Sequence, residues 1–188
     1  MNSGKLELII GNMFSGKSTE LIRRIKRELS IHKKILVINY IDDNRYYDTE
    51  VISTHDKTTF ESLKIKNFKK ILNNINQISS YDSIFIDEGQ FFTDLYESVK
   101  YLTDTLQKHV IVAGLDGDSN RSIFGQMLSL IPIADNILKL KAYCIKCSNR
   151  NYAPFTKKIA EFNNPINSID IGGIDKYIPV CRYHYLTE

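Results

Sequence analysis

The segment from residue 6 to residue 19 (LELIIGNMFSGKST) constrains the fold of this chain more than any other. Gly11, Gly16, Lys17 and Ser18 fill the pattern G-x-x-x-x-G-K-[ST], in which backbone N–H groups surround phosphate oxygens at a helix N-terminus. Lys17 can add a positive charge beside the β- and γ-phosphates, and the Ser18 hydroxyl can ligate Mg²⁺. The residues between the two glycines, which are expected to form the same phosphate-binding loop, are Asn12, Met13, Phe14 and Ser15.

The sequence on either side of this loop argues against a chance glycine turn. Residues 6–10 form a short apolar run of strand type. After the loop, apolar residues recur at helical spacing, at Leu21, Ile22, Ile25 and Leu29. A phosphate-binding loop of this kind has to lie between a strand and a helix, so the context supports the motif.

The remainder of the first 140 residues alternates between strand and helix patterns. Apolar, β-rich runs predict buried strands over residues 34–40, 83–87 and 110–113. Helices are expected over residues 60–79 and along Leu95, Val99, Leu102 and Leu106. Because strands that alternate with helices are typical of parallel sheets, we expect an α/β fold of the P-loop NTPase type, with helices flanking a parallel sheet.

Other segments do not fit this alternation. Residues 41–59 are polar and aperiodic, and they are too long for a simple connection, so we expect a functional loop. Residues 124–130 can form a short helix that Pro132 ends. The pattern changes near residue 141, which predicts a nucleotide-binding domain over residues 1–140 and a small domain over residues 141–188.

Two adjacent acids follow the apolar run at residues 83–86. Asp87 would lie beside the phosphate-binding loop in such a sheet, where a carboxylate can hold Mg²⁺ directly or through water. Glu88 can accept a proton from a nucleophile, which is water in an ATPase and a substrate hydroxyl in a kinase. A capping or solvated carboxylate is the alternative for either acid. From these residues alone, the chain is a P-loop phosphotransferase or NTPase.

The three cysteines and one histidine form two short pairs in the last 45 residues. Cys144 and Cys147 make a C-x-x-C pair, and Cys181 and His184 make a C-x-x-H pair after 33 intervening residues. Such ligands suit tetrahedral Zn²⁺, and a site filled entirely by protein ligands is structural. The alternatives are a metal-free C-x-x-C pair and an ordinary surface histidine. A zinc ion would explain how this weakly apolar segment becomes ordered.

Composition argues against several classes of partner. The net charge of +3 is small, and acidic residues are interleaved with basic ones, which disfavours nucleic acid and anionic membranes as ligands. There is no apolar run of membrane-spanning length and no N-terminal signal pattern. We therefore expect a soluble, cytoplasmic protein whose cysteines remain thiols available for metal.

Five motifs, taken in order, resemble those of the type II thymidine kinases, which are zinc-containing P-loop deoxynucleoside kinases. They are GNMFSGKST at residues 11–19, DEGQFF at 87–92, AGLDG at 113–117, FG at 124–125 and IGGIDKY at 171–177. The resemblance implies ATP-dependent phosphorylation of thymidine at its 5′-hydroxyl, with Glu88 as the general base and with Mg²⁺ and structural Zn²⁺ as cofactors. It also implies a homotetramer and feedback inhibition by thymidine triphosphate.

The resemblance assigns further residues to the two substrates. On the ATP side it adds Asp43, Arg45 and Gln90. The loop between Cys147 and Cys181 corresponds to the family's lasso, which closes over the nucleoside. The residues that the resemblance places around the nucleoside are Met13, Phe91, Leu115, Phe124 and Tyr177, together with backbone groups of Ile169, Asp170, Ile171 and Gly172.

The chain departs from the family pattern at two positions. Ser119 stands where the family usually places an aromatic residue in the nucleoside pocket, which predicts an open wall there unless Ile123 leans in. His184 replaces the fourth cysteine of many members, and zinc chemistry permits it.

Two other kinds of P-loop protein remain as alternatives. A GTPase-type switch lacks support, because the guanine-reading sequence Asn-Lys-x-Asp is absent. A DNA-repair or recombination ATPase would use the zinc knuckles to grip nucleic acid, but the segment between them has no strong basic stripe.

Overall fold

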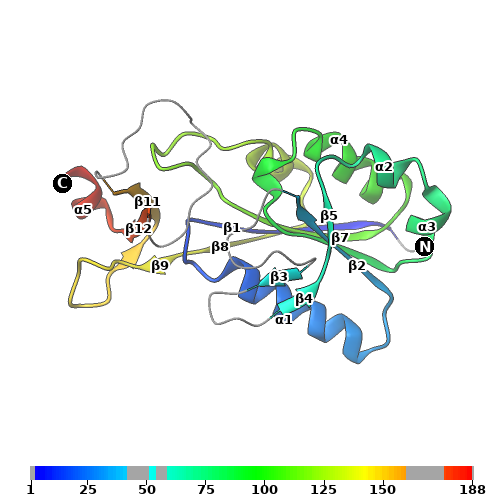
Figure 1. Ribbon diagram of the computed structural model, residues 1–188, viewed down its shortest axis with the longest axis horizontal. Helices are drawn as coiled ribbons and strands as arrows, with labels where there is room; N and C mark the ends of the chain where they lie inside the picture. The colour runs from blue at the N-terminus through cyan, green and yellow to red at the C-terminus, as the bar shows by residue number, and fades with distance from the viewer. Residues whose placement is uncertain (1–2, 42–50, 54–58, 160–175, 188) are drawn as a thin grey trace.

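A computed structural model describes residues 3–41, 51–53, 59–159 and 176–187. Its centre is a six-stranded sheet in the order β5-β2-β6-β7-β1-β8, in which every neighbouring pair is parallel (Figure 1). This confirms the α/β fold with a parallel sheet. The strands are β1 (Lys5–Gly11), β2 (Ile35–Tyr40), β5 (Leu63–Ile65), β6 (Ser83–Ile86), β7 (His109–Gly114) and β8 (Asn136–Leu140).

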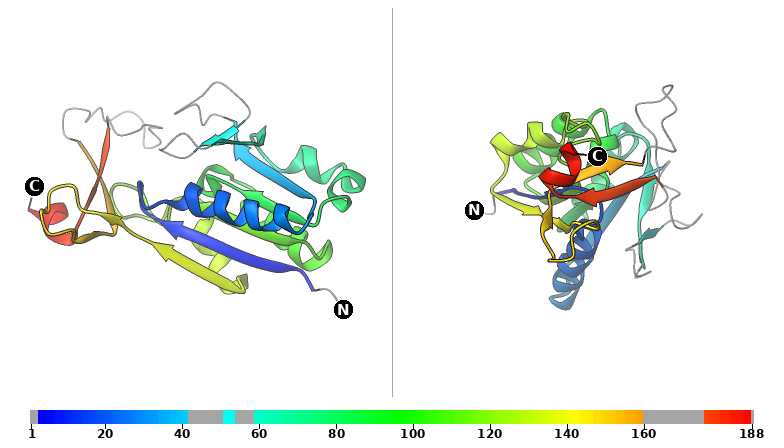
Figure 2. Two further views of the ribbon diagram at one scale, coloured as in Figure 1. Left: turned by 90° about the horizontal axis from the view of Figure 1, so that it is seen from below. Right: turned by 90° about the vertical axis from the view of Figure 1, so that its left-hand side faces the viewer.

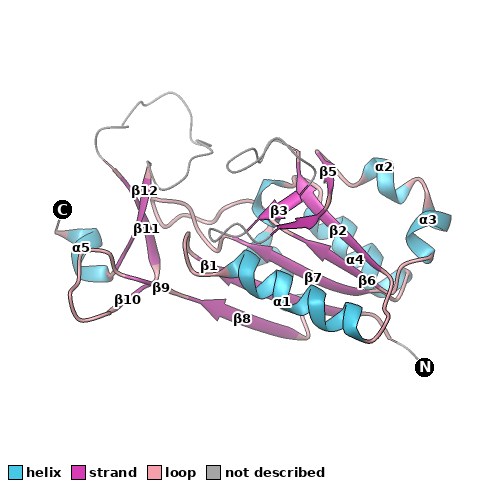
Figure 3. Cartoon of the chain, turned by 60° about the horizontal axis from the view of Figure 1, so that its bottom comes forward, coloured by secondary structure: helices cyan, strands magenta, loops and turns pink. Residues whose placement is uncertain are grey.

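Helices cover both faces of this sheet. Helix α1 (Lys17–Ser30) lies on one face, and α4 (Leu95–Lys100) lies on the other (Figure 3). The remaining helical segments are α2 (Lys69–Leu72), α3 (Ile75–Ser79), a π-helical turn after α4 (Tyr101–Thr105), and 3₁₀ helices at Gly89–Phe91 and Met127–Ile133. No helix in the described ranges is long and apolar enough to cross a membrane.

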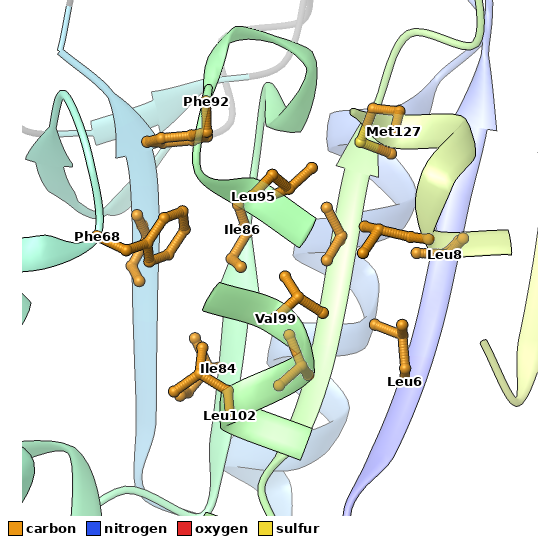
Figure 4. Close-up of a cluster of buried hydrophobic side chains, with 14 of the residues drawn as sticks. Leu6, Leu8, Phe68, Ile84, Ile86, Phe92, Leu95, Val99, Leu102 and Met127 are labelled. Carbon is orange, nitrogen blue, oxygen red and sulfur yellow. The ribbon is translucent and has the colours of Figure 1, made fainter. Parts of the chain in front are cut away.

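Alternate residues of the strands contribute side chains to two hydrophobic clusters, one on each face of the sheet. Leu8 and Ile10 of β1 pack toward α4, whereas Ile9 between them packs toward Leu21 and Ile25 of α1. Figure 4 shows the cluster on the α4 side, where Leu95, Val99 and Leu102 meet the strands and Phe92. Burial on both faces explains why the central strands have continuous apolar runs.

The C-terminal residues form a small module at one end of the elongated molecule (Figures 1 and 2). It contains β9 (Ala142–Tyr143) paired with β10 (Tyr152–Ala153), β11 (Phe155–Lys158) paired with β12 (Tyr177–Val180), and helix α5 (Arg182–Leu186). A separate hydrophobic cluster, which includes Ala142, Cys144, Ala153 and Val180, lies within it. We call these elements the C-terminal module. The domain boundary at residue 141 stays a prediction.

The helix expected over residues 60–79 is wrong in its first part. Strand β3 (Val51–Ser53) pairs with β4 (Thr59–Glu61), and β5 then joins the free edge of β2. Pairing with β2 buries Ile65 and overrides the local pattern, so that helices begin only at Lys69. Strand β3 also lies within residues 41–59, which were expected to be irregular, and β4 begins at the last of them.

The helix expected at residues 124–130 is displaced along the chain. It begins at Met127, has 3₁₀ geometry, and contains Pro132 instead of ending before it. Proline has no N–H to donate within a helix. Because Pro132 is exposed, water can replace the hydrogen bond that is missing there.

Candidate active site and metal centre

The phosphate-binding loop connects β1 to α1, as the motif predicts. Gly16 has φ +85°, a left-handed conformation that favours glycine, although no atom would obstruct a Cβ there. Gly11 has φ +154°, and space is restricted there as well, because a Cβ would lie 2.4 Å from the carbonyl oxygen of Leu140. Backbone conformation therefore favours glycine at both positions, and close packing adds a second reason at Gly11.

Inside the loop, the carbonyl oxygen of Asn12 is a common acceptor. The buried Lys17 donates from Nζ to this oxygen at 2.8 Å, and the Ser15 hydroxyl donates to it at 2.8 Å. These bonds hold the ammonium group of Lys17 against its own loop. Lys17 is the first residue of α1, the position that the motif predicts, and its contact with phosphate stays a prediction.

Residues of the C-terminal module brace the outside of this loop. The backbone N–H of Met13 donates to Thr156 Oγ1 at 3.0 Å. The side chain of Asn12 donates to the carbonyl oxygen of Phe155 and accepts from the N–H of Ala142, each at 3.4 Å. The phosphate-binding loop is therefore fixed between the sheet and the module.

The two acids lie at the same edge of the sheet as this loop. Strand β7 separates β6 from β1, and all three run parallel, so their carboxyl ends meet at one edge. Asp87 and Glu88 are 4% and 8% exposed. Asp87 Oδ1 accepts the N–H of Glu88 at 3.0 Å. Glu88 itself has φ +53°, a left-handed conformation that turns the chain sharply out of β6.

Gln90 joins Glu88 to the loop after β7. Its amide nitrogen donates to Glu88 Oε2, and its amide oxygen accepts the N–H of Leu115 at 2.9 Å. The side chain is only 3% exposed. The resemblance assigned Gln90 to ATP, whereas these side-chain hydrogen bonds join it to Glu88 and Leu115. A role in ATP binding stays a prediction.

Aromatic residues lie in the segments that follow β6 and β7. The rings of Phe91 and Phe124 meet edge to face with centroids 5.5 Å apart, and the centroid of the Tyr40 ring lies 5.3 Å from that of Phe91. Leu115, which is buried, lies in the same segment after β7 as Phe124. Such rings supply flat apolar contact area of the kind that a nucleobase requires.

The position without the usual aromatic residue contacts the C-terminal module. The carbonyl oxygen of Ser119 accepts the Tyr185 hydroxyl at 2.8 Å. Ile123 is 72% exposed, so it does not fill the space that an aromatic residue at position 119 would use. Whether Ser119 lines a nucleoside pocket stays a prediction.

The four expected metal ligands converge in the C-terminal module. Cys144 and Cys147 follow β9, and Cys181 and His184 lie at α5. Their four ligand atoms all lie within 4.8 Å of one another. The sulfurs of Cys147 and Cys181 are 3.8 Å apart, and His184 Nδ1 lies 3.3–3.5 Å from the three sulfurs.

These distances fit a tetrahedral zinc ion. With Zn–S bonds of about 2.3 Å and Zn–N bonds of about 2.0 Å, a tetrahedron places two sulfurs about 3.8 Å apart and a sulfur and a nitrogen about 3.5 Å apart. Hydrogen bonds from the backbone N–H of His184 and from its ring also lower the pKa of the Cys181 thiol to about 6. A lower pKa favours the thiolate, which is the form that binds metal. The cluster therefore supports a structural zinc site.

Comparison with known proteins identifies the family. A family model described as thymidine kinase matches residues 4–185. The chain belongs to the thymidine kinase family. It is 44% identical over 189 residues to the thymidine kinase of Variola virus and 43% identical over 188 residues to that of Vaccinia virus strain Western Reserve, and each alignment covers all of both chains. It is 41% identical over 188 residues to thymidine kinase a of Arabidopsis thaliana, an alignment that covers 99% of this chain and 76% of that protein.

These matches confirm the resemblance to type II thymidine kinases, and they make the protein an enzyme of the kinase class. The match spans both the sheet and the C-terminal module of this thymidine kinase family member. Some site residues assigned by resemblance lie outside the described ranges, and their roles stay predictions: Asp43, Arg45, Ile169, Asp170, Ile171 and Gly172. Tyr177 is described, in β12, where it pairs with Lys158.

Sequence reasoning about this thymidine kinase family member missed residues that the fold brings to the site. Tyr40 ends β2 beside Phe91, and an aromatic residue at the end of a predicted buried strand was a usable signal. Thr156 and Tyr185 carried no such signal, because their contacts join segments 143 and 66 residues apart.

Proposed function

We propose that this protein transfers the γ-phosphoryl group of Mg·ATP to the 5′-hydroxyl of thymidine, with Glu88 as the general base. The observation that carries the proposal is the position of the Glu88 carboxylate, held by Gln90, at the sheet edge where the phosphate-binding loop begins. The family and the names of the relatives support thymidine as the acceptor.

In this reaction the chain mainly positions groups and neutralises charge. The N–H groups of the phosphate-binding loop and Lys17 bind the triphosphate. The side-chain oxygens of Ser18 and Asp87 suit Mg²⁺, whose chemistry there is to offset negative charge on the phosphates. Glu88 accepts the proton of the 5′-hydroxyl as the bond from that oxygen to phosphorus forms and the bond from phosphorus to the ADP oxygen breaks. The proton then lies on the Glu88 carboxyl group, and ADP leaves.

We also propose thymidine triphosphate as a feedback inhibitor that places its base in the nucleoside pocket and its phosphates at the loop. Assembly into a homotetramer and a location in the cytoplasm belong to the same proposal. The proposal does not include a nucleic acid partner. The family model spans both the sheet and the zinc cluster, which favours one kinase over an ATPase that grips DNA.

The first test changes Glu88→Gln. The amide keeps an oxygen that can accept from Gln90 but cannot take up the substrate proton, so kcat should fall about 10²- to 10⁴-fold while ATP and thymidine affinities stay near their original values. Glu97→Gln, an exposed position on α4, is the matched control and should leave kcat unchanged. Turnover of the Glu88→Gln protein within twofold of the original would exclude Glu88 as the base.

A second test separates the proposed substrate from the alternative. ADP release should be measured with each of the four deoxynucleosides and with single- and double-stranded DNA. We expect thymidine to give the largest stimulation. ADP release that depends on DNA and not on thymidine would show that the alternative is correct.

A further inference from the structure

The C-terminal module contacts the phosphate-binding loop through a buried hydroxyl. Thr156 on β11 is 5% exposed, and its Oγ1 accepts the N–H of Met13 at 3.0 Å. The neighbouring carbonyl of Phe155 accepts from the Asn12 side chain. The conformation of the loop at Asn12 and Met13 is therefore set by β11 as well as by the motif itself.

The same module contacts the loop after β7 at a second point. The Tyr185 hydroxyl of α5 donates to the carbonyl oxygen of Ser119 at 2.8 Å. The guanidinium of Arg121 lies 4.3 Å from the centre of the Tyr185 ring and 5.5 Å from that of Phe155, within the range of cation–π attraction. One aromatic side chain thus holds this loop by its hydroxyl and by its ring.

The loop presents these groups in a defined conformation. Asp118 Oδ1 accepts the N–H groups of Asn120 and Ser122, each at 2.8 Å, and the backbone of Asp118 pairs with Ser122 at 2.9 Å. Arg121 has φ +64°, in the left-handed region. Hydrogen bonds within residues 118–122 fix the conformation of this turn, and the bond from Tyr185 to Ser119 attaches it to the module. The module therefore fixes the position of the turn as a whole.

Within the module, the residues on either side of Thr156 contact α5. Lys157, adjacent to Thr156, donates from Nζ to the carbonyl oxygens of His184 and Tyr185 at 3.2 and 3.3 Å. The rings of Phe155 and Tyr185 pack with centroids 5.5 Å apart. These contacts attach β11 to α5 within the module.

We propose that Thr156 and Tyr185 are positioning residues, through which the C-terminal module orders the phosphate-binding loop for ATP and the loop of residues 115–124 for the nucleoside. This inference rests on the proposed function, because it assigns one substrate to each loop. Neither side chain is placed against a substrate. Each holds a backbone group, so its effect on binding passes through the loop that it holds.

Because each contact depends on a single hydroxyl, near-isosteric variants can test it. Thr156→Val keeps the branched shape and removes the acceptor, so the Kd for ATP should rise about two- to tenfold, with little change for thymidine. Thr156→Ser should restore ATP affinity. Thr105→Val, at an exposed threonine of the π-helical turn, is the matched control and should change neither Kd.

Tyr185→Phe keeps the ring under Arg121 and removes the bond to Ser119. The Kd for thymidine should rise about two- to tenfold, with the Kd for ATP and kcat at saturation close to their original values. Tyr183→Phe, at a 67% exposed position on the same helix, is the control. Both constants are measured by calorimetric titration of intact, zinc-containing protein, so that binding is observed independently of turnover.

The outcomes separate this inference from the proposed function. If the unaltered protein binds neither ATP nor thymidine, the proposed function fails. If it binds both, but Thr156→Val matches Thr105→Val and Tyr185→Phe matches Tyr183→Phe, the positioning roles are wrong. Equal weakening of both ligands in each variant also contradicts the assignment of one loop to each substrate. Should Thr156→Val fail to fold, Thr156→Ala removes the same acceptor with a smaller side chain and tests the ATP arm. Tyr185→Phe, which removes one oxygen from a partly exposed side chain, tests the thymidine arm.

Discussion

At the scale of single residues, the proposed base has an uncommon backbone conformation. Glu88 adopts φ +53° although it has a side chain, and a residue in that region typically costs about 1 kcal/mol or more. Gln90 and Asp87 bind its carboxylate and its N–H respectively. The local strain is held by the surrounding contacts, and it directs the carboxylate at the end of β6 toward the loop after β7.

A second residue-scale feature lies on α1. Glu20 accepts from Arg23 at 2.6 Å and from Arg24 at 2.8 Å, and Arg24 also donates to Glu7. The hydrogen bond from Arg23, followed by that from Arg24, lowers the pKa of Glu20 from 4.5 to about 2. These ion pairs join the first turns of α1 to the start of β1.

The pKa of Glu20 predicts how acid affects stability. Because the folded-state pKa lies below the unfolded value, the stabilisation is complete above about pH 4.5 and is lost as the pH falls toward 2. Glu20→Gln should lower the free energy of unfolding by about 0.5–1 kcal/mol at pH 7, since partly exposed ion pairs contribute little. Urea titrations of both proteins between pH 7 and pH 3 should show this difference shrinking only below pH 4.5. A difference that stays constant down to pH 3 would contradict the assignment, and Glu97→Gln serves as the control.

At the scale of elements, the loops after β6 and β7 are interlocked. Gln90 lies between Glu88 and Leu115, and Gly125 packs directly on its backbone. A Cβ at Gly125 would lie 2.0 Å from the carbonyl oxygen of Gln90, and Gly125 also has φ +59°. Both space and backbone conformation therefore require glycine at this position.

Gly125→Ala should consequently disturb both the proposed base and the ring contact between Phe91 and Phe124. We expect a loss of about 1–3 kcal/mol in the free energy of unfolding, from overpacking and backbone strain, and a fall in kcat because Gln90 is displaced. Gly117→Ala is the matched control in the same loop, where the nearest atom to the new Cβ would be the Ser122 oxygen at 3.2 Å. Thermal unfolding and steady-state kinetics measure both effects. Equal effects of the two substitutions would show that the packing against Gln90 is unimportant.

The central strands and α1 could be predicted because each is specified by its own sequence. Apolar runs at β1, β2, β6 and β7 reflect burial on both faces of the sheet. The helical spacing of apolar residues after Gly16 reflects the packing of α1 against one of these faces. Strand β5 could not be predicted in this way. Its three residues become a strand because the edge of β2 is available for pairing, which is a property of the tertiary fold.

The candidate site was predictable to the same extent. Lys17, Asp87 and the four metal ligands follow from motifs whose spacing states the chemistry, and the structure gathers the metal ligands as expected. The bonds from Gln90 to Leu115 and from Tyr185 to Ser119 could not be found, because no local pattern marks a contact between distant backbone and side-chain groups.

At the scale of the whole molecule, the two parts differ in what stabilises them. The sheet has two large clusters of buried apolar side chains, whereas the cluster of the C-terminal module is small and includes Cys144. Because few side chains are buried in the module, we expect it to depend on a metal cross-link between β9 and α5.

Metal removal should therefore loosen the module first. We expect about one zinc per chain by elemental analysis, and chelation should accelerate amide hydrogen exchange in β9–β12 and α5 while β1 and β7 remain protected. His184→Cys should retain zinc, because thiolate is an equivalent ligand. Restoring zinc should restore protection. Freshly prepared protein without zinc, or simultaneous loss of protection in β7 and β9, would contradict this account.

The place of β7 between β1 and β6 has a further consequence for the chemistry at the sheet edge. Two inter-strand spacings of about 4.8 Å separate the end of β1 from the end of β6, so the main chain at the start of the phosphate-binding loop and the main chain that bears the proposed base are held about 10 Å apart. Hydrogen bonding within the sheet sets this distance, and loop sequence does not. Donor and acceptor must meet within that interval, which is short enough for side chains from both edges to reach one phosphorus atom. Variation in the loops can consequently alter which molecules bind while the span available for phosphoryl transfer stays the same.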